Sequence, residues 1–129
     1  MRQEGAILQS ALFDYLQADD RLIKRYAPIA EADVSPQFSY DGMRSQWFDR
    51  ALSLTRHLLE FSVWHAQAAF ADGDNVSADL IDRVQGLSLA APNELVQIRL
   101  QAIETGFDAS SRLWRQQLEF EALIYRVAS

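Results

Sequence analysis

Two histidines, His57 and His65, are the residues best suited by type to metal binding or acid–base chemistry in this chain. A metal site on a helix needs a second ligand three or four residues away on the same face. Glu60, three residues after His57, supplies the only such pairing. At helical spacing His57 projects near a polar stripe and His65 toward an apolar one, so the two do not converge. We therefore expect a solvated His57, a packed His65 and no metal ion or cofactor.

The candidate nucleophiles are the serines Ser53, Ser110 and Ser111, because the chain has no cysteine. The lack of cysteine also excludes disulfides and thiolate metal sites. Neither Ser110 nor Ser111 has a histidine at helical spacing that could act as its base. The GxSxG, GxGxxG and P-loop patterns are absent as well. We therefore expect a protein that is not an enzyme, and a helical enzyme or metal carrier using His57 and Glu60 is the least favoured alternative.

Trp64 is the residue whose position indicates binding most directly. In a helical projection it lies in a polar stripe, among Arg56, Glu60 and Gln67. A tryptophan exposed beside charged side chains is typical of interface hot spots. We predict a partner-binding surface made of Trp64, Arg56, Glu60 and Gln67. The alternative is that the first helix, or the connector after it, covers Trp64.

The composition indicates which elements carry these residues. A chain of 129 residues that is 49% hydrophobic has enough apolar material for one domain with one core. Five glycines and three prolines are few for a β-protein with many tight turns. Alanine, leucine, glutamine and arginine, which favour helices, are frequent. We therefore expect a single all-α domain over residues 1–129, an antiparallel bundle of three long helices and one short helix, with no sheet.

Hydrophobic periodicity places these helices along the chain. The first has Asp19 within its apolar face. Either Asp19 lies at the rim, or the helix is interrupted near Ala18 and restarts with Asp19 or Asp20 as its N-cap. The last helix begins at Pro92, a good first-turn residue. The predicted helices span about residues 3–26, 42–71, 77–85 and 92–127, and the connector spans residues 28–41.

The predicted last helix carries two apolar seams, roughly 130° apart at 3.6 residues per turn. Two seams need two packing partners. One partner is the second helix, and the other is either the first helix or a second copy of the chain. We favour the second copy, which predicts a two-fold homodimer. The residues predicted for self-association are Phe107, Trp114, Leu118 and Tyr125.

The charge limits the classes of partner. A net charge of −6 argues against nonspecific nucleic-acid binding, which needs a surplus of basic residues. It also argues against electrostatic docking on anionic lipid. The sequence contains no apolar run of ~18 residues that could span a membrane, and no signal-peptide core. We therefore expect an acidic cytoplasmic protein that does not bind nucleic acid.

Two segments of the chain carry a resemblance to a known family: Leu59-Glu60-Phe61-Ser62-Val63-Trp64-His65-Ala66-Gln67-Ala68-Ala69 and Ala91-Pro92-Asn93-Glu94-Leu95-Val96-Gln97. Through them residues 47–127 resemble the phasin family, bacterial helical proteins that coat polyhydroxyalkanoate granules. The resemblance implies a non-catalytic protein whose apolar helix face adsorbs on a hydrophobic granule while its charged stripe faces water. The alternative function is a small dimeric regulator that binds and inhibits one protein partner.

Overall fold

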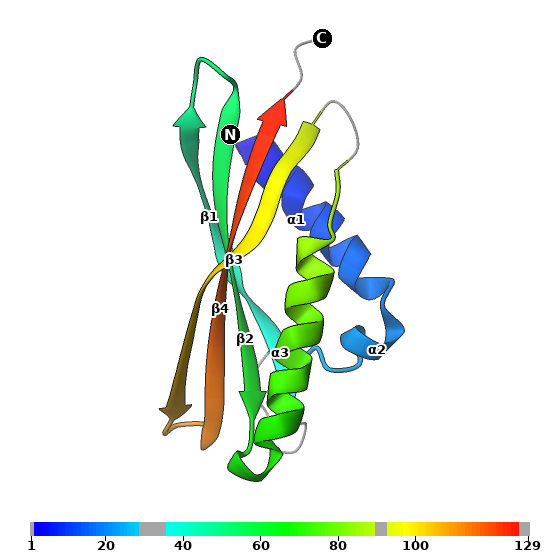
Figure 1. Ribbon diagram of the computed structural model, residues 1–129, viewed down its shortest axis with the longest axis vertical. Coiled ribbons are helices and arrows are strands. Elements are labelled where there is room, and N and C mark those ends of the chain that lie inside the picture. The colour runs from blue at the N-terminus through cyan, green and yellow to red at the C-terminus, as the bar shows by residue number, and fades with distance from the viewer. Residues whose placement is uncertain (1, 29–35, 90–92, 127–129) are drawn as a thin grey trace.

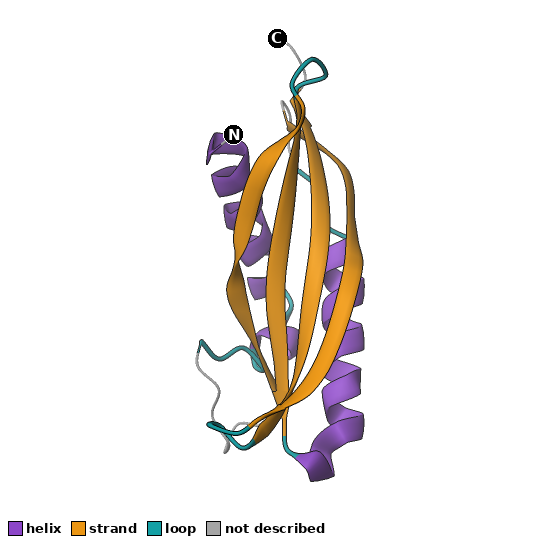
Figure 2. Ribbon diagram, turned by 90° about the vertical axis from the view of Figure 1, so that its left-hand side faces the viewer, coloured by secondary structure: helices purple, strands orange, loops and turns teal. Residues whose placement is uncertain are grey.

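The chain folds into a four-stranded antiparallel sheet with its helices packed on one face (Figure 1). A computed structural model describes residues 2–28, 36–89 and 93–126. Figure 2 looks onto the sheet, with the helices behind it. The strands are β1 (Gln37–Asp49), β2 (Leu54–His65), β3 (Asn93–Asp108) and β4 (Leu113–Arg126), in the spatial order β1-β2-β4-β3. The helical elements are α1 (Arg2–Gln17), α2 (Asp20–Ile23), the 3₁₀ turn η2 (Gln67–Ala69) and α3 (Phe70–Gln85).

The core lies between the helices and one face of the sheet. Side chains alternate between the two faces of a strand, so every second residue of β2 and β4 is buried against the helices. Helices α1 and α3 each supply apolar residues four apart, which form one stripe on a helix. The rings of Phe61 and Phe120 meet edge to face at 5.8 Å, joining the two central strands. The core includes Leu8, Leu12, Leu16, Leu59, Phe61, Val63, Val76, Leu80, Val84, Leu118, Phe120, Ala122 and Ile124.

The predicted all-α bundle is wrong. The segment predicted as a helix over residues 42–71 contains the β1–β2 hairpin and the start of α3, and the one over residues 92–127 contains the β3–β4 hairpin. A strand signal was present in both. Residues 59–63 read Leu-Glu-Phe-Ser-Val and residues 118–122 read Leu-Glu-Phe-Glu-Ala, the strict alternation typical of a half-buried strand. These two segments pair directly with each other in the sheet.

Both hairpins turn without glycine, which is why a low glycine count did not exclude a sheet. In the first turn the carboxylate of Asp49 accepts a backbone N–H at 3.1 Å, and Ser53 adopts a left-handed φ of 52°. In the second turn Asp108 accepts a backbone N–H at 3.0 Å, and Arg112 has a φ of 60°. An aspartate that caps the turn and a residue in the left-handed region together close a compact hairpin loop.

Of the two alternatives for the predicted first helix, the structure confirms the interruption near Ala18. Helix α1 ends at Gln17, and α2 begins at Asp20 after the N-cap Asp19. The carboxylate of Asp19 accepts the N–H of Leu22 at 3.0 Å, which satisfies a backbone donor of the new helix. This interruption lets the chain turn before it enters β1.

The predicted short helix, residues 77–85, lies within α3, which begins seven residues earlier than 77, at Phe70. The predicted connector includes the first residues of β1. Its residues 29–35 and the predicted helix start Pro92 lie outside the described residues. Among the helices that the structure describes, none is long and apolar enough to cross a membrane.

Candidate interaction surfaces

Three of the four residues predicted to bind a partner share one face of the sheet. Arg56, Glu60 and Trp64 lie four residues apart on β2, an even spacing that keeps all three on the face away from the helices. Gln67 follows the strand in η2 and is exposed. The structure therefore brings the first three to one face and places Gln67 beyond its end; their role in binding stays a prediction.

Trp64 is half-buried in a hydrogen-bonded network on this outer face. Its indole Nε1 donates to Ser39 Oγ at 3.1 Å, and the Arg115 guanidinium lies 4.9 Å from the centre of its ring. Arg115 also donates to Ser62 Oγ at 2.8 Å and to Asp41 at 3.2 Å. The hydroxyl of Ser62 donates to Asp41 as well. The network joins β1, β2 and β4. Because α1 packs on the opposite face of the sheet, the first helix, one of the two covers considered for Trp64, does not cover it.

Arg56 and Glu60 are also engaged within the sheet. The Nε of Arg56 lies 2.6 Å from a carboxylate oxygen of Glu121 on β4. Glu60 lies 4.0 Å from Arg44 on β1. The outer face thus carries ion pairs that cross from strand to strand.

The residues predicted for self-association separate into different environments. Phe107 is 56% exposed, and its ring meets that of Trp114 edge to face at 5.6 Å. Leu118 is buried in the core. Tyr125 lies an odd number of residues after Leu118 on β4, so it lies on the other face of the sheet. The structure brings Phe107 and Trp114 together and keeps Leu118 and Tyr125 apart from them.

His57 is fully buried, so the predicted solvated side chain is wrong. Its Nδ1 lies 2.7 Å from Ser45 Oγ and its Nε2 lies 2.9 Å from Thr55 Oγ1. Burial lowers the pKa of His57 to about 4, although the nearby Glu4 carboxylate acts in the opposite direction. The ring is thus neutral near pH 7, with both nitrogens hydrogen-bonded, which fits a structural role.

His65 is packed, as predicted, and is also fully buried. His57 faces the helices, whereas Glu60, three residues on, faces the other side of the sheet, so the pairing considered for a metal cannot form. Within residues 2–28, 36–89 and 93–126 no group of three or more histidines and carboxylates could hold a metal ion.

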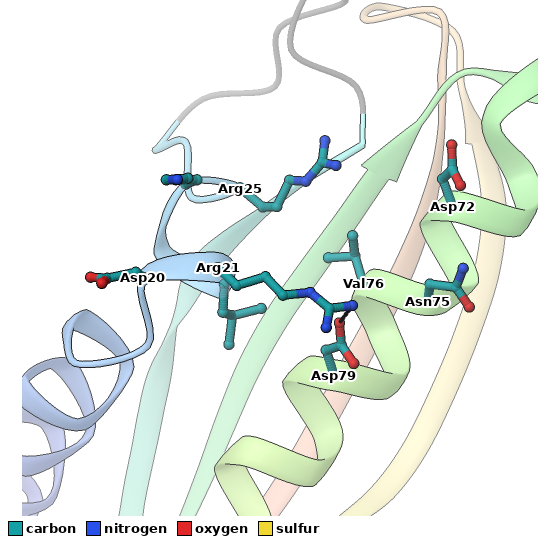
Figure 3. A pocket seen from close by; sticks show the side chains of 9 residues that line it. Asp20, Arg21, Arg25, Asp72, Asn75, Val76 and Asp79 are labelled. Carbon is teal, nitrogen blue, oxygen red and sulfur yellow. Dashed lines mark ion pairs between the residues drawn. The ribbon is translucent and has the colours of Figure 1, made fainter.

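A polar groove of about 650 Å³ lies between α2 and α3 (Figure 3). Arg21 reaches across it to Asp79, at 3.1 Å. Basic residues of α2 and the segment after it line the groove together with acidic residues of both helices, so the groove presents no single charge. Its lining residues, among those that the structure describes, include no histidine, serine or threonine. The lining residues are Asp20, Arg21, Leu22, Lys24, Arg25, Asp72, Asn75, Val76 and Asp79.

The β1–β2 turn and the β3–β4 turn lie at opposite ends of the sheet (Figure 1). Exposed apolar side chains occur near each of them. At the β1–β2 turn, Trp47 is 38%, Phe48 58% and Leu52 59% exposed. In the half of β3 nearest the β3–β4 turn, Ile103 is 49% exposed and lies close in sequence to Phe107. Of these five residues the sequence interpretation selected only Phe107. The sequence interpretation missed the other four because it did not place the hairpin turns. A residue beside a turn lies past the helices that cover the rest of the strand.

The fold is shared with a chain of a gene transfer agent virion. No family model matches the sequence, and no curated protein matches it. Among solved structures, the fold matches a chain from the "Virion of native gene transfer agent (GTA) particle" with a TM-score of 0.74. The match covers 94% of this chain and 96% of that chain at 20% sequence identity. At this identity the likeness shows a common fold.

These findings correct the predicted function. The phasin resemblance depended on long amphipathic helices over residues 47–127, where the structure has the end of β1, strands β2 to β4 and α3. Granule association through helix faces is therefore wrong, and so is the alternative of a helical dimeric regulator. The solved structure that shares the fold is a chain of a gene transfer agent virion.

Proposed function

We propose that this chain is a structural subunit of a multi-protein particle and acts through protein–protein contacts, without catalysis or a resident cofactor. The observation that carries the proposal is the fold match along nearly the whole of both chains with a gene transfer agent virion protein. An assembly subunit needs surfaces that remain available after folding, and the two edges of the sheet are such surfaces. The cysteine-free composition fits assembly in the reducing cytoplasm.

The edges of the sheet are covered only in part. Phe38, near the start of β1, donates to Arg25 O at 2.8 Å and accepts from Ala27 N at 2.9 Å. On β3 the N–H of Leu100 donates to the side chain of Gln85 at 3.0 Å. Beyond these contacts, the described part of the chain supplies no further strand to either edge. Uncovered edges present backbone groups that can pair with another chain.

The exposed apolar residues at the two ends support the same proposal. Large apolar side chains grouped on a surface mark protein–protein contacts more often than isolated ones do. Here they stand at a turn and on an edge strand, where another subunit can approach without disturbing the core.

The proposal is tested by locating the protein in its native cell. The chain carrying a small affinity tag should sediment with large particles, and mass spectrometry of those particles should find it together with other structural proteins. Purified protein should also form discrete assemblies or bind another particle protein, as measured by light scattering. A protein found only as a free monomer, absent from every particle fraction, would contradict the proposal.

A further inference from the structure

We propose that a pocket between the α1–α2 junction and the sheet binds a small, neutral aromatic molecule of one or two fused rings. This aromatic pocket has a volume of about 270 Å³. It is lined by the last turn of α1, by α2 and the segment after it, and by strands β1 and β2. Such binding goes beyond the particle role and does not depend on it.

Aromatic rings make up most of the lining of the pocket. Neighbouring rings lie 5.1–6.4 Å apart, centre to centre, with their planes inclined by 50–85°. Inclined rings present both electron-rich faces and electropositive edges, and another aromatic ring packs well against both. The rings form one continuous series, in the order Tyr26, Phe38, Phe61, Tyr40 and Phe13.

The walls of the pocket are held in place by the fold itself. The hydroxyl of Tyr40 donates to Gln9 Oε1 at 2.9 Å, which ties its ring to α1. Backbone hydrogen bonds of 2.8 and 2.9 Å join Phe38 to the residues on either side of Tyr26. These bonds hold the Tyr26 segment against β1. A pocket ordered in this way loses little conformational freedom when a ligand binds.

The volume and the exposure of the rings set the size of the ligand. An apolar cavity of about 150 Å³ is large enough for benzene, so a pocket of about 270 Å³ accommodates up to two fused rings. Phe38 and Phe61 are buried and form the floor. Tyr26 is 39% exposed, and Phe13 and Tyr40 are half-buried, so a ligand can reach these three rings from solvent.

The lining favours a neutral ligand over an ion. Among the described residues that line the pocket none is charged, so a bound ion would lose its hydration without gaining a counter-charge. Burial raises the pKa of Tyr40 to about 12, so this phenol also stays neutral at ordinary pH. The amide of Gln17, an exposed residue that lines the pocket, can exchange a hydrogen bond with one polar group of the ligand. Indole and phenol have all of these properties.

Methyl NMR with indole as the probe tests where binding occurs. Indole should shift the methyl signals of Leu16 and Ile23, which line the pocket, through its ring current. The methyl signals of Ile98, buried on β3, should not move. Ile103 is exposed outside the pocket and reports nonspecific adsorption. Unchanged signals at Ile23, or equal shifts at Ile23 and Ile103, overturn the proposal.

Matched probes test the class of ligand. Phenol and cyclohexanol share a hydroxyl and are similar in size, but only phenol makes ring-to-ring contacts. Phenol should therefore bind about fivefold more tightly. Benzylammonium, which carries a charge, should bind more weakly than phenol. Cyclohexanol or benzylammonium that binds as tightly as phenol overturns the proposed class.

A substitution in the pocket and a matched control connect binding to the rings. Tyr26→Ser removes the most exposed ring of the pocket and should weaken indole binding about tenfold. Tyr125→Ser makes the same change at a half-buried tyrosine of β4 outside the pocket and should leave binding unchanged. Thermal melting shows whether both variants fold. Folded variants with equal affinity for indole overturn the proposal.

A short peptide distinguishes a free molecule from the side chain of another protein. Acetyl-Gly-Trp-Gly-amide presents the indole ring on a backbone and should bind more weakly than indole. Peptide that binds as tightly as indole overturns the assignment to a small molecule. The particle role is measured separately by sedimentation, so its failure and the failure of this proposal are distinguishable.

Discussion

At the scale of single residues, His57 shows how burial decides what a titratable group does. The ring lies between the hydroxyls of Ser45 and Thr55 and has no exposed surface. Protonation would place a charge in a space where water cannot solvate it, so the pKa of His57 falls to about 4. The unfolded chain binds a proton near the ordinary value of about 6.5. Between these two values the unfolded state holds more protons than the folded state.

We therefore expect the free energy of unfolding to fall as the pH drops from about 6.5 toward 4. For His57 alone the loss between pH 7.5 and pH 5 should be about 2 kcal/mol. His57→Gln keeps a polar side chain and removes the titration, so its stability should change less over the same range. Urea unfolding of both proteins at the two pH values measures the difference. Equal changes in wild type and variant would show that His57 does not contribute.

At the scale of elements, the packing of α3 on β2 depends on a close approach at Gly73. A Cβ atom at this position would lie 2.5 Å from Cδ2 of the His65 ring, which is itself fully buried. The ring also carries a 2.8 Å hydrogen bond between its Nδ1 and the carbonyl of Ala66. A glycine inside a helix costs about 1 kcal/mol relative to alanine, so the close packing must offset that cost.

Gly73→Ala should accordingly destabilise the fold by about 1–2 kcal/mol, because overpacking outweighs the gain in helix propensity. Gly106→Ala is the matched control, since an added Cβ there meets no atom within 4 Å and the backbone needs no positive φ. The control should change stability by less than about 0.5 kcal/mol. Thermal unfolding of the two variants decides the matter, and a more stable Gly73→Ala would refute the close approach.

At the scale of the whole molecule, ion pairs tie the strands together on the face that no described helix covers. Glu121 on β4 is central to them. One of its oxygens lies 2.6 Å from Arg56 Nε on β2, and the other accepts from Gln97 on β3 at 3.0 Å. Its side chain is only 11% exposed, so water screens these contacts poorly. Glu119 on the same strand is more exposed and lies 3.8 Å from Arg44.

Glu121→Gln should lower the free energy of unfolding by about 1–3 kcal/mol, because an amide nitrogen would then face a donor and Arg56 would lose its counter-charge. Glu119→Gln makes the same chemical change at a solvated pair and should cost less than about 0.5 kcal/mol. Chemical denaturation at low and high salt provides the measurement. Similar losses for both variants would mean that burial does not distinguish the two carboxylates.

Part of the predicted binding surface was found for a reason that does not depend on the element type. Arg56, Glu60 and Trp64 are four residues apart. A spacing of four keeps residues near one face of a helix, and it also keeps them on one face of a strand. Their grouping could therefore be predicted from the sequence even though the helix was wrong. His57 and Glu60 are three apart, a spacing that joins them on a helix and separates them on a strand.

What the sequence determined by itself is local. Asp19 caps α2 because its carboxylate reaches a donor three residues away, and that contact needs nothing from the rest of the chain. Only the tertiary structure decided between helix and strand for β2 and β4. Leu59 lies opposite Phe120, and Phe61 opposite Leu118, across about sixty residues of sequence. Backbone hydrogen bonds in a sheet come from a distant partner, so a short segment cannot show whether it has one.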